Sequence, residues 1–247
     1  MGLLAAFQFL TILPLRFKTS SRAMGRSLAY FPIVGLALGG FLYGLDQLFE
    51  LALPPYLVNI LLIVALFVIT GALHLDGFID TADGLAAGRS PAARLEIMRD
   101  SRVGSFGVIG ACCLILLLYA ALLSLPAGHR MESIVLMPVI ARWAVVYAVI
   151  AYPYARGEQG MGAGFKKEAN WFSLAFATVF TLATALVLMQ LEGLAVMAGA
   201  WLISVLIATY LSRRLGGLTG DTYGAINEVV GIAVLILIPL ITWSYNL

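Results

Sequence analysis

The sequence predicts an all-α, polytopic integral membrane helix bundle with about seven transmembrane helices. Hydrophobic residues make up 62% of the 247 residues and charged residues only 11%, whereas soluble domains are about half apolar and about a quarter charged. Apolar runs of about 20 residues recur along the chain, which is the length that an α-helix needs to cross a bilayer. No internal repeat and no long polar stretch divides the chain. Residues 1–247 are therefore expected to form a single membrane domain.

Seven apolar runs are long enough to be transmembrane helices. A shorter apolar segment, residues 2–15, precedes them and is interrupted by Pro14. It is expected to form an interfacial or re-entrant helix, and without a basic start or a small-residue cleavage site it is not expected to be a signal peptide. The expected spans are residues 27–48, 55–75, 106–125, 133–152, 172–191, 194–211 and 229–243.

The positions of lysine and arginine predict the orientation in the membrane. If the N-terminus is cytoplasmic and seven spans alternate, every basic residue except Arg130 and Arg142 falls in a cytoplasmic segment. The positive-inside rule then predicts a multi-pass protein of the bacterial cytoplasmic (inner) membrane, with its C-terminus outside. The net charge of +2 reflects this topology, and no patch of basic and aromatic residues indicates nucleic-acid binding.

Three aspartates follow the second expected span, in the stretch H-L-D-G-F-I-D-T-A-D-G-L. Asp76, Asp80 and Asp83 are spaced i, i+4 and i+7, so a helix that continues this span places them on one face. Stacked carboxylates repel each other, and hard oxygen ligands of this kind suit Mg²⁺, Mn²⁺ or Ca²⁺. The stretch therefore predicts a metal site, and the alternative is a solvated helix end. Gly77 and Gly84, beside two of the aspartates, are expected to let a substrate approach the backbone.

Basic residues with a complementary charge come next along the chain. Arg99 and Arg102 flank Asp100 just before the third span, and arginines beside a glycine-containing turn are suited to binding phosphate through two hydrogen bonds. The alternative is that they only anchor the chain at the membrane surface. Arg142 lies within the fourth span, where an arginine is a functional candidate that should face the interior of the bundle.

The segment 217–228, G-L-T-G-D-T-Y-G-A-I-N-E, combines a possible helix start with two further acids. The free N–H groups after Gly220 are suited to a phosphate. Asp221 and Glu228 are spaced i and i+7, and both are expected at the cytoplasmic mouth of the last span. If the last span packs beside the second, Asp221 joins the metal shell and Glu228 supports it or orients the attacking group.

Three polar segments, residues 76–102, 155–167 and 217–228, are expected at the cytoplasmic face. Their acids and arginines suit phosphoryl transfer there. His74, two residues before Asp76, is a candidate general base, and an interfacial hydrogen-bonded histidine is the alternative. The expected roles are catalytic for His74, Asp80, Arg99, Arg102 and Glu228, substrate-binding for Gly77, Gly84, Asp100, Arg142 and Gly220, and metal-ligating for Asp76, Asp80, Asp83 and Asp221.

Small residues in the first span form two close-packing patterns, Gly35-x-x-x-Gly39 and Gly40-x-x-x-Gly44. Patterns of this kind let two helices approach closely. They are expected to serve packing within the chain, and a homo-oligomer is the alternative.

Several stretches together resemble the cobalamin synthase family, the adenosylcobinamide-GDP ribazoletransferases. The main ones are G-A-L-H-L-D-G-F-I-D-T-A-D-G-L (71–85), M-R-D-S-R-V-G-S-F-G (98–107) and G-L-T-G-D-T-Y-G-A-I-N-E (217–228). Supporting stretches are F-L-T-I-L-P-L (9–15), F-P-I-V-G (31–35) and Y-A-R-G-E-Q-G-M-G-A-G-F (154–165). The resemblance therefore covers nearly the whole chain in order.

The resemblance implies a reaction and its partners. The family joins α-ribazole, or its 5′-phosphate, to adenosylcobinamide-GDP with Mg²⁺, giving adenosylcobalamin or its phosphate and releasing GMP. The implied partners are these two substrates, membrane lipids and possible other corrinoid-assembly enzymes.

Two alternatives remain. The first is a membrane enzyme of lipid synthesis similar to the CDP-alcohol phosphotransferases, whose D-G-x2-A-R pattern this chain departs from because Asp80 stands at the alanine position. The second is a cation-coupled transporter, which would place acids at the bilayer midplane and not at one face.

Overall fold

The computed structural model describes residues 1–15, 21–157 and 160–244, and side chains for all of these except 21, 22, 161, 243 and 244. Arg16 and Lys18, two of the basic residues used to predict orientation, lie outside the described residues. Within the described part, the chain is almost entirely helical and its only β-type pairing is an isolated bridge between Tyr154 and Leu218. The all-α fold class is confirmed.

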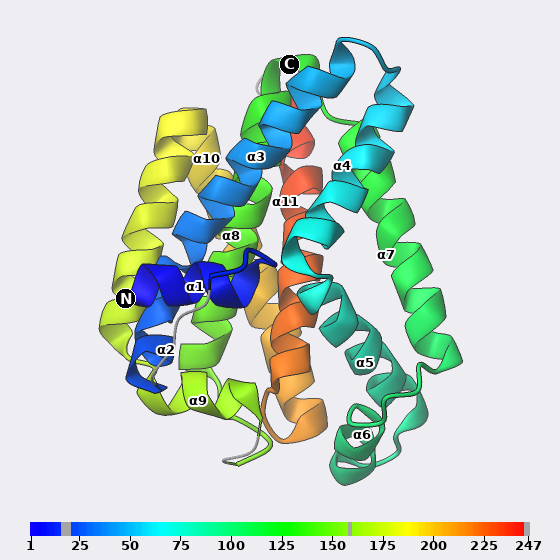
Figure 1. Ribbon diagram of the computed structural model, residues 1–247, viewed down its shortest axis with the longest axis vertical. Helices are drawn as coiled ribbons and strands as arrows, with labels where there is room; N and C mark the ends of the chain where they lie inside the picture. Colours follow the sequence, from blue (N-terminus) through cyan, green and yellow to red (C-terminus); the bar gives the residue numbers. More distant parts are fainter. Residues whose placement is uncertain (16–20, 158–159, 245–247) are drawn as a thin grey trace.

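The described helices pack into one bundle with a short helix lying across it (Figure 1). Two 3₁₀ turns, η1 (Leu28–Tyr30) and η2 (Ala127–His129), lead directly into long helices. The α-helices are α1 (Gly2–Leu10), α2 (Ser21–Ser27), α3 (Phe31–Glu50), α4 (Pro55–Thr70), α5 (Leu73–Ala87), α6 (Pro91–Ile97), α7 (Ser105–Leu123), α8 (Arg130–Ala151), α9 (Met161–Glu168), α10 (Trp171–Leu215) and α11 (Gly220–Ser244).

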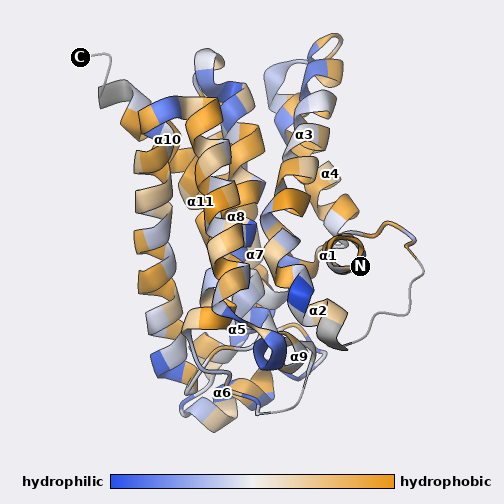
Figure 2. Cartoon of the chain, turned by 90° about the vertical axis from the view of Figure 1, so that its left-hand side faces the viewer, coloured by the Kyte–Doolittle hydropathy of each residue, from blue (hydrophilic) through white to orange (hydrophobic). Residues whose placement is uncertain are grey.

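Five helical segments of the described chain are long and apolar enough to cross a membrane, and a bent helix pair can make a sixth span. The bent pair is α4 and α5, which meet at an angle of 92°. Apolar residues fill the middle of the molecule and hydrophilic ones gather at its two ends (Figure 2). The five segments are Ala23–Glu50, Ser105–Leu123, Ala127–Ala151, Trp171–Leu215 and Gly220–Thr242.

The second expected span does not continue straight into the aspartates. Gly71 and Ala72 have φ values of 60° and 53°, in the left-handed region, and end α4. Ala72 then starts α5, which carries His74 and the three aspartates in a new direction. The expectation of one continuous helix is wrong here, because the positive φ at Gly71 stops the run of helical hydrogen bonds.

The fifth and sixth expected spans meet at a break inside α10. Gln190 has φ 51° and ψ −131°, which are not helical angles. Figure 1 shows the chain turning back there, at the same end of the bundle as the end of α11. The break falls at the end of the predicted run 172–191, just before the run 194–211, and the total of seven spans stays a prediction.

The last helix begins at Gly220, at the helix start expected there, and so extends ahead of the predicted span 229–243. Thr219 and Thr222 stabilise this start reciprocally, since the N–H of Thr222 donates to Thr219 Oγ1 at 3.2 Å and the N–H of Thr219 donates to Thr222 Oγ1 at 2.8 Å. Such side-chain caps satisfy the unpaired N–H groups of a first turn. The polar segment with Asp221 and Glu228 is therefore part of the helix.

The centre of the bundle is α8, which is buried over most of its surface by α3, α10 and α11. At Gly39 of α3, an added Cβ would lie 2.7 Å from the carbonyl oxygen of Val135 in α8, and one at Gly35 would clash with Pro138. Neither Gly40 nor Gly44 has any atom within 4 Å of an added Cβ. Packing within the chain thus accounts for the first glycine pattern and not for the second.

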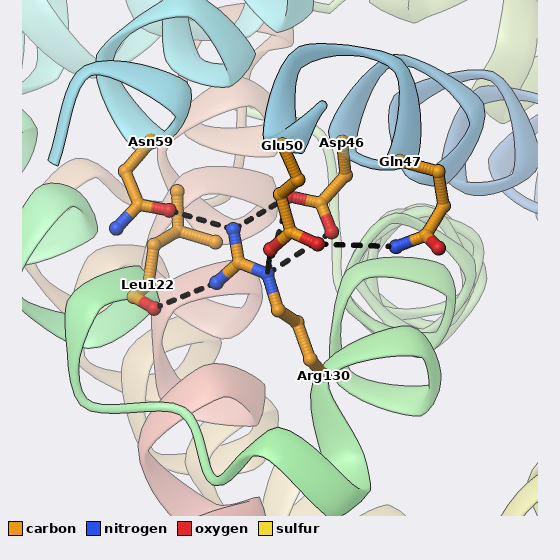
Figure 3. Close-up of polar contacts among 6 residues, drawn as sticks. All are labelled: Asp46, Gln47, Glu50, Asn59, Leu122 and Arg130. Carbon is orange, nitrogen blue, oxygen red and sulfur yellow. Dashed lines mark hydrogen bonds and ion pairs between the residues drawn. The ribbon is translucent and has the colours of Figure 1, made fainter. Parts of the chain in front are cut away.

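A buried ion pair joins four helices at the end of the bundle opposite α6 and α9. Arg130 at the start of α8 donates to Asp46 Oδ1 at 2.6 Å, to Asn59 Oδ1 at 2.8 Å and to the carbonyl oxygen of Leu122 at 3.3 Å (Figure 3). The Asp46 side chain is fully buried and that of Arg130 is 16% exposed. This cluster ties together α3, α4, α7 and α8.

Asp46→Asn is expected to lower the free energy of unfolding by up to about 3–5 kcal/mol, because it leaves the largely buried Arg130 with only the partly exposed Glu50, at 3.4 Å, as its counterion. Thermal or denaturant unfolding in detergent measures this loss. The matched control is Asp100→Asn, since Asp100 pairs with Arg102 at 2.6 Å on the surface and exposed pairs contribute little to stability. Equal free energies of unfolding for the two variants would show that the buried Asp46 pair contributes no more stability than the exposed Asp100 pair.

Candidate active site

The three polar segments predicted to share one face of the membrane converge at one end of the bundle, around α5, α6 and α9 (Figure 1). The N–H of Ala155 donates to the carbonyl oxygen of Leu218 at 2.8 Å, and Arg94 donates to the carbonyl oxygen of Arg214 at 2.9 Å. The expectation that these segments lie together is confirmed.

Helices α5 and α11 touch backbone to backbone at this end. A Cβ added at Gly77 would lie 2.7 Å from the carbonyl oxygen of Asp221, and one at Gly224 would lie 2.8 Å from that of His74. The last helix therefore packs beside the aspartate helix, as predicted. This contact explains Gly77 as a packing residue, although it also lines the cavity described below.

The second glycine beside an aspartate also serves packing. A Cβ added at Gly84 would lie 3.0 Å from the carbonyl oxygen of Arg94 in α6. Gly84 does not line the cavity, so its expected role in substrate binding finds no support in its surroundings. The close approach of α6 to α5 is what requires a residue without a side chain.

A cavity of about 390 Å³ lies where α5, α11 and the segment after α8 meet. Its polar rim carries two carboxylates, Asp76 and Asp221, and one guanidinium group, that of Arg156. The predicted site residues that line it are His74, Asp76, Gly77, Gly220 and Asp221.

Asp80 does not line the cavity, but its carboxylate lies near the two that do. The carboxylates of Asp76, Asp80 and Asp221 lie within electrostatic range of one another. Within the described residues, no three His, Cys, Asp or Glu side chains are arranged as a ready set of metal ligands. The predicted cluster is therefore a group of neighbouring charges, and any metal held there needs ligands from elsewhere.

The positive charge of the rim comes from Arg156, which was not predicted as a site residue. Its Nη2 lies 2.8 Å from Asp221 Oδ2, and its Nε has no hydrogen-bond partner among the described residues. The sequence feature that could have identified Arg156 is its place in the stretch Y-A-R-G-E-Q-G-M-G-A-G-F, directly after an expected span. A basic residue at this position is already expected from the positive-inside rule. The distribution of charged residues therefore did not distinguish Arg156 as a site residue.

Tyr154 stands beside Arg156 on the same wall. Burial raises the pKa of the Tyr154 hydroxyl above its usual value, while the nearby Arg156 charge opposes the shift. The hydroxyl thus stays protonated at neutral pH and is a hydrogen-bond donor at the rim. Arg99 also acts on Tyr154 electrostatically, which places Arg99 near the rim.

Asp83 has a different partner from the other aspartates. It accepts hydrogen bonds from the N–H groups of Gly104 at 2.8 Å and Gly107 at 2.7 Å, at the start of α7. Both of its oxygens are therefore engaged in capping a helix, where a carboxylate is also favoured by the helix dipole. The surroundings of Asp83 argue against the predicted metal ligation, because this side chain turns toward α7.

Arg102 and Asp100 pair with each other at 2.6 Å, with 87% of the Arg102 side chain exposed. The hydrogen bonds from Arg102 lower the pKa of Asp100 to about 2. Neither residue lines the cavity. The arginine expected to bind a diphosphate is instead a surface partner of its own neighbour.

Arg142 and Glu228 lie deeper in the bundle. Together with Asn227 they line a separate cavity of about 10 Å³, large enough for about one water molecule. Arg142 faces the interior, as predicted. Glu228 does not lie at the mouth of the last span, because α11 begins at Gly220 and Glu228 is two turns inside it.

Comparison with known proteins gives the family. Residues 2–239 match the family described as cobalamin-5-phosphate synthase. Relatives named adenosylcobinamide-GDP ribazoletransferase include those of Desulforamulus reducens, 39% identical over 95% of this chain and 94% of the relative, and Roseiflexus sp., 40% identical over 95% and 88%. No solved structure gives a significant match. The chain belongs to the cobalamin-5-phosphate synthase family.

Proposed function

We propose that this protein is an adenosylcobinamide-GDP ribazoletransferase. It joins adenosylcobinamide-GDP to α-ribazole or its 5′-phosphate, giving adenosylcobalamin or its phosphate and GMP. The observation that carries the proposal is the cavity rim, where Asp76, Asp221 and Arg156 meet. Carboxylates beside a guanidinium group suit metal-assisted transfer between phosphate esters.

The chemical step replaces the anhydride bond of the corrinoid-bound phosphorus atom by an ester bond. A ribose hydroxyl oxygen of the α-ribazole substrate attacks that phosphorus, the bond to the GMP phosphate oxygen breaks, and GMP leaves. His74 lines the cavity next to Asp76 and is the proposed acceptor of the hydroxyl proton. A neutral imidazole suits this task because one of its two ring nitrogens can accept a proton.

Arg156 and the start of α11 are the proposed binding groups for the diphosphate. The Arg156 guanidinium is paired with Asp221, and its Nε has no partner among the described residues, so it can donate to a phosphate without leaving the site. Gly220 lines the cavity at the first turn of α11, and the N-terminus of a 25-residue helix favours an anion.

Mg²⁺ fits this donor set. Mg²⁺ is usually held by one or two carboxylates together with substrate phosphates, and Asp76 and Asp221 are two carboxylates on one cavity wall. We infer that these two hold the ion, with Asp80 in electrostatic range as the third acid. A Mg²⁺ ion held there would supply positive charge to the phosphate groups during transfer.

The cavity end of the bundle is proposed to face the cytoplasm of a bacterial inner membrane. Described basic residues at this end include Arg94, Arg156 and Lys166, while Arg130 lies at the other end. This distribution follows the positive-inside rule. Membrane lipids are the surroundings that the apolar helices require.

The test is turnover by purified protein in detergent, with adenosylcobinamide-GDP, α-ribazole and Mg²⁺. GMP and a cobalamin product are expected in equal amounts by chromatography. Removal of the metal with EDTA should lower the rate at least about 100-fold, since metal ions supply several kcal/mol to such transfers, and added Mg²⁺ should restore it.

Three controls separate the alternatives. GMP release without α-ribazole would indicate hydrolysis and contradict the transfer. Full activity in EDTA would contradict the metal and leave the transferase assignment in place. Release of CMP from a CDP-alcohol and lipid acceptor would support the lipid-synthesis enzyme instead.

A further inference from the structure

The cavity has an apolar half that the chemistry of phosphoryl transfer does not need. Three phenylalanines line it, Phe9 from α1, Phe31 from α3 and Phe165 from α9. We propose that this apolar half binds the aromatic base of the α-ribazole substrate, and that the three rings set which bases are accepted. The inference rests on the proposed function, because it assigns one of its two substrates to one part of the cavity.

The three rings form a mutually packed group. The centroid of Phe165 lies 4.8 Å from that of Phe9 and 5.7 Å from that of Phe31, both in edge-to-face geometry. Phe9 and Phe31 are nearly parallel, 16° apart, with centroids 6.0 Å apart. Edge-to-face and offset contacts are the arrangements in which aromatic rings attract one another, so a flat heteroaromatic base finds both ring faces and ring edges in this wall.

The position of Phe165 is held by its neighbour. The Nζ of Lys166 donates to the carbonyl oxygens of Val149, Ile150 and Tyr152 at 2.9, 3.1 and 2.7 Å, around the end of α8. These bonds satisfy carbonyls that the end of a helix leaves unpaired. They attach α9 to α8 and so place the Phe165 ring in the wall before any ligand binds.

Cavity size favours α-ribazole over the corrinoid. A volume of about 390 Å³ lies at the small end of the range for sites that enclose a drug-sized ligand. A nucleoside is of this size, whereas a corrin macrocycle with its nucleotide is several times larger. The diphosphate of the corrinoid substrate is therefore expected to reach the rim from outside, while the smaller substrate occupies the interior.

Polarity gives the orientation of the bound nucleoside. The phenylalanines of the apolar wall come from α1, α3 and α9, whereas Asp76 and Asp221 of the rim come from α5 and α11 and Arg156 from the segment after α8. A nucleoside with its base against the phenylalanines thus directs its ribose toward the carboxylates. The buried hydroxyl of Tyr223, also on the cavity wall, has no partner among the described residues and can donate to a ring nitrogen or a ribose oxygen.

The inference is tested with Phe9→Leu and Phe165→Leu, which remove a ring and keep an apolar side chain. The KM for α-ribazole is expected to rise about tenfold in each, an effect near the upper end for one aromatic contact. The KM for adenosylcobinamide-GDP should change less than about twofold. Phe9→Tyr, which keeps the ring at a partly exposed position, should bind α-ribazole nearly as the parent protein does.

Phe176→Leu is the matched control, because the Phe176 ring packs against Tyr30 at 5.7 Å and does not line the cavity. It should leave both KM values unchanged. Thermal unfolding of every variant shows whether it is folded. For a Phe165→Leu protein that does not fold, Phe9→Leu, at the more exposed position, decides the result.

Direct titration of α-ribazole into protein without corrinoid separates this inference from the proposed function. Binding that weakens in Phe9→Leu and Phe165→Leu supports the base site even in a preparation without turnover. Unchanged α-ribazole binding in both variants overturns it. A raised KM for the corrinoid substrate alone also overturns it. The inference is likewise overturned if the variants lose a bound lipid and not the binding of α-ribazole.

Discussion

Asp221→Asn is expected to lower turnover at least about 100-fold, because it removes one of the two cavity carboxylates proposed to hold the metal. It also leaves Arg156, whose Nη2 lies 2.8 Å from Asp221 Oδ2, without its carboxylate partner. Steady-state assays at saturating Mg²⁺ and substrates measure the loss. Binding of the corrinoid substrate should be largely retained, since that substrate is expected to reach the rim from outside.

Asp100→Asn is the matched control for this variant. Asp100 also pairs with an arginine, at 2.6 Å, but on the surface, and it does not line the cavity. Its turnover should be close to that of the parent protein. A similar loss in both variants would mean that the exposed pair belongs to the site after all.

A purely structural role for Asp221 makes a different prediction. Thr219 Oγ1 donates to Asp221 Oδ2 at 3.4 Å near the start of α11, and a capping contact is worth about 1 kcal/mol of stability. In that case the thermal unfolding temperature of Asp221→Asn would fall and the folded fraction would keep its turnover rate. Unfolding scans beside the assay distinguish the two roles.

Gly39→Val is expected to lower the free energy of unfolding by about 1–3 kcal/mol or more, the cost of overpacking a filled interface. The first added atom would already lie 2.7 Å from the Val135 carbonyl oxygen. This oxygen belongs to the backbone of α8, the buried centre of the bundle, so it cannot turn aside as a flexible side chain would. Denaturant unfolding in detergent gives the change directly.

Gly40→Ala provides the comparison from the same helix. Nothing lies within 4 Å of a Cβ at this position, and replacing a helical glycine by alanine stabilises by up to about 1 kcal/mol. If Gly39→Val were as stable as Gly40→Ala, that result would contradict the close approach of α3 to α8 at Gly39. A second variant, Gly40→Val, tests association between chains. If it forms smaller oligomers than the parent protein, the second glycine pattern serves that association.

The fold class could be predicted from composition for a simple physical reason. In a bilayer every backbone N–H and C=O must find a partner within the chain, so apolar runs of this length become helices. The bend at Gly71 and the start of α11 at Gly220 were not predictable from hydropathy. They depend on a left-handed residue and on two threonine caps, which contribute little to an average over 20 residues.

The arrangement of the candidate site could be predicted only in part. Asp76 and Asp221 were identified as acids of one site, and the packing of α5 on α11 places them on one cavity wall. Asp83 was included with them because its spacing puts it near the same helix face. Its oxygens accept from Gly104 and Gly107, and no spacing rule shows that another helix begins there.

The sequence by itself thus determined that this chain is a membrane-embedded helix bundle with its acids and arginines in three polar segments. Only the tertiary structure decided which of them meet. Arg156 joins Asp221 at the cavity, Arg102 turns to Asp100 on the surface, and Glu228 lies inside the bundle. The physical reason is that helical periodicity assigns a residue to a face of its own helix, whereas the neighbour of that face is set by packing between helices far apart in the chain.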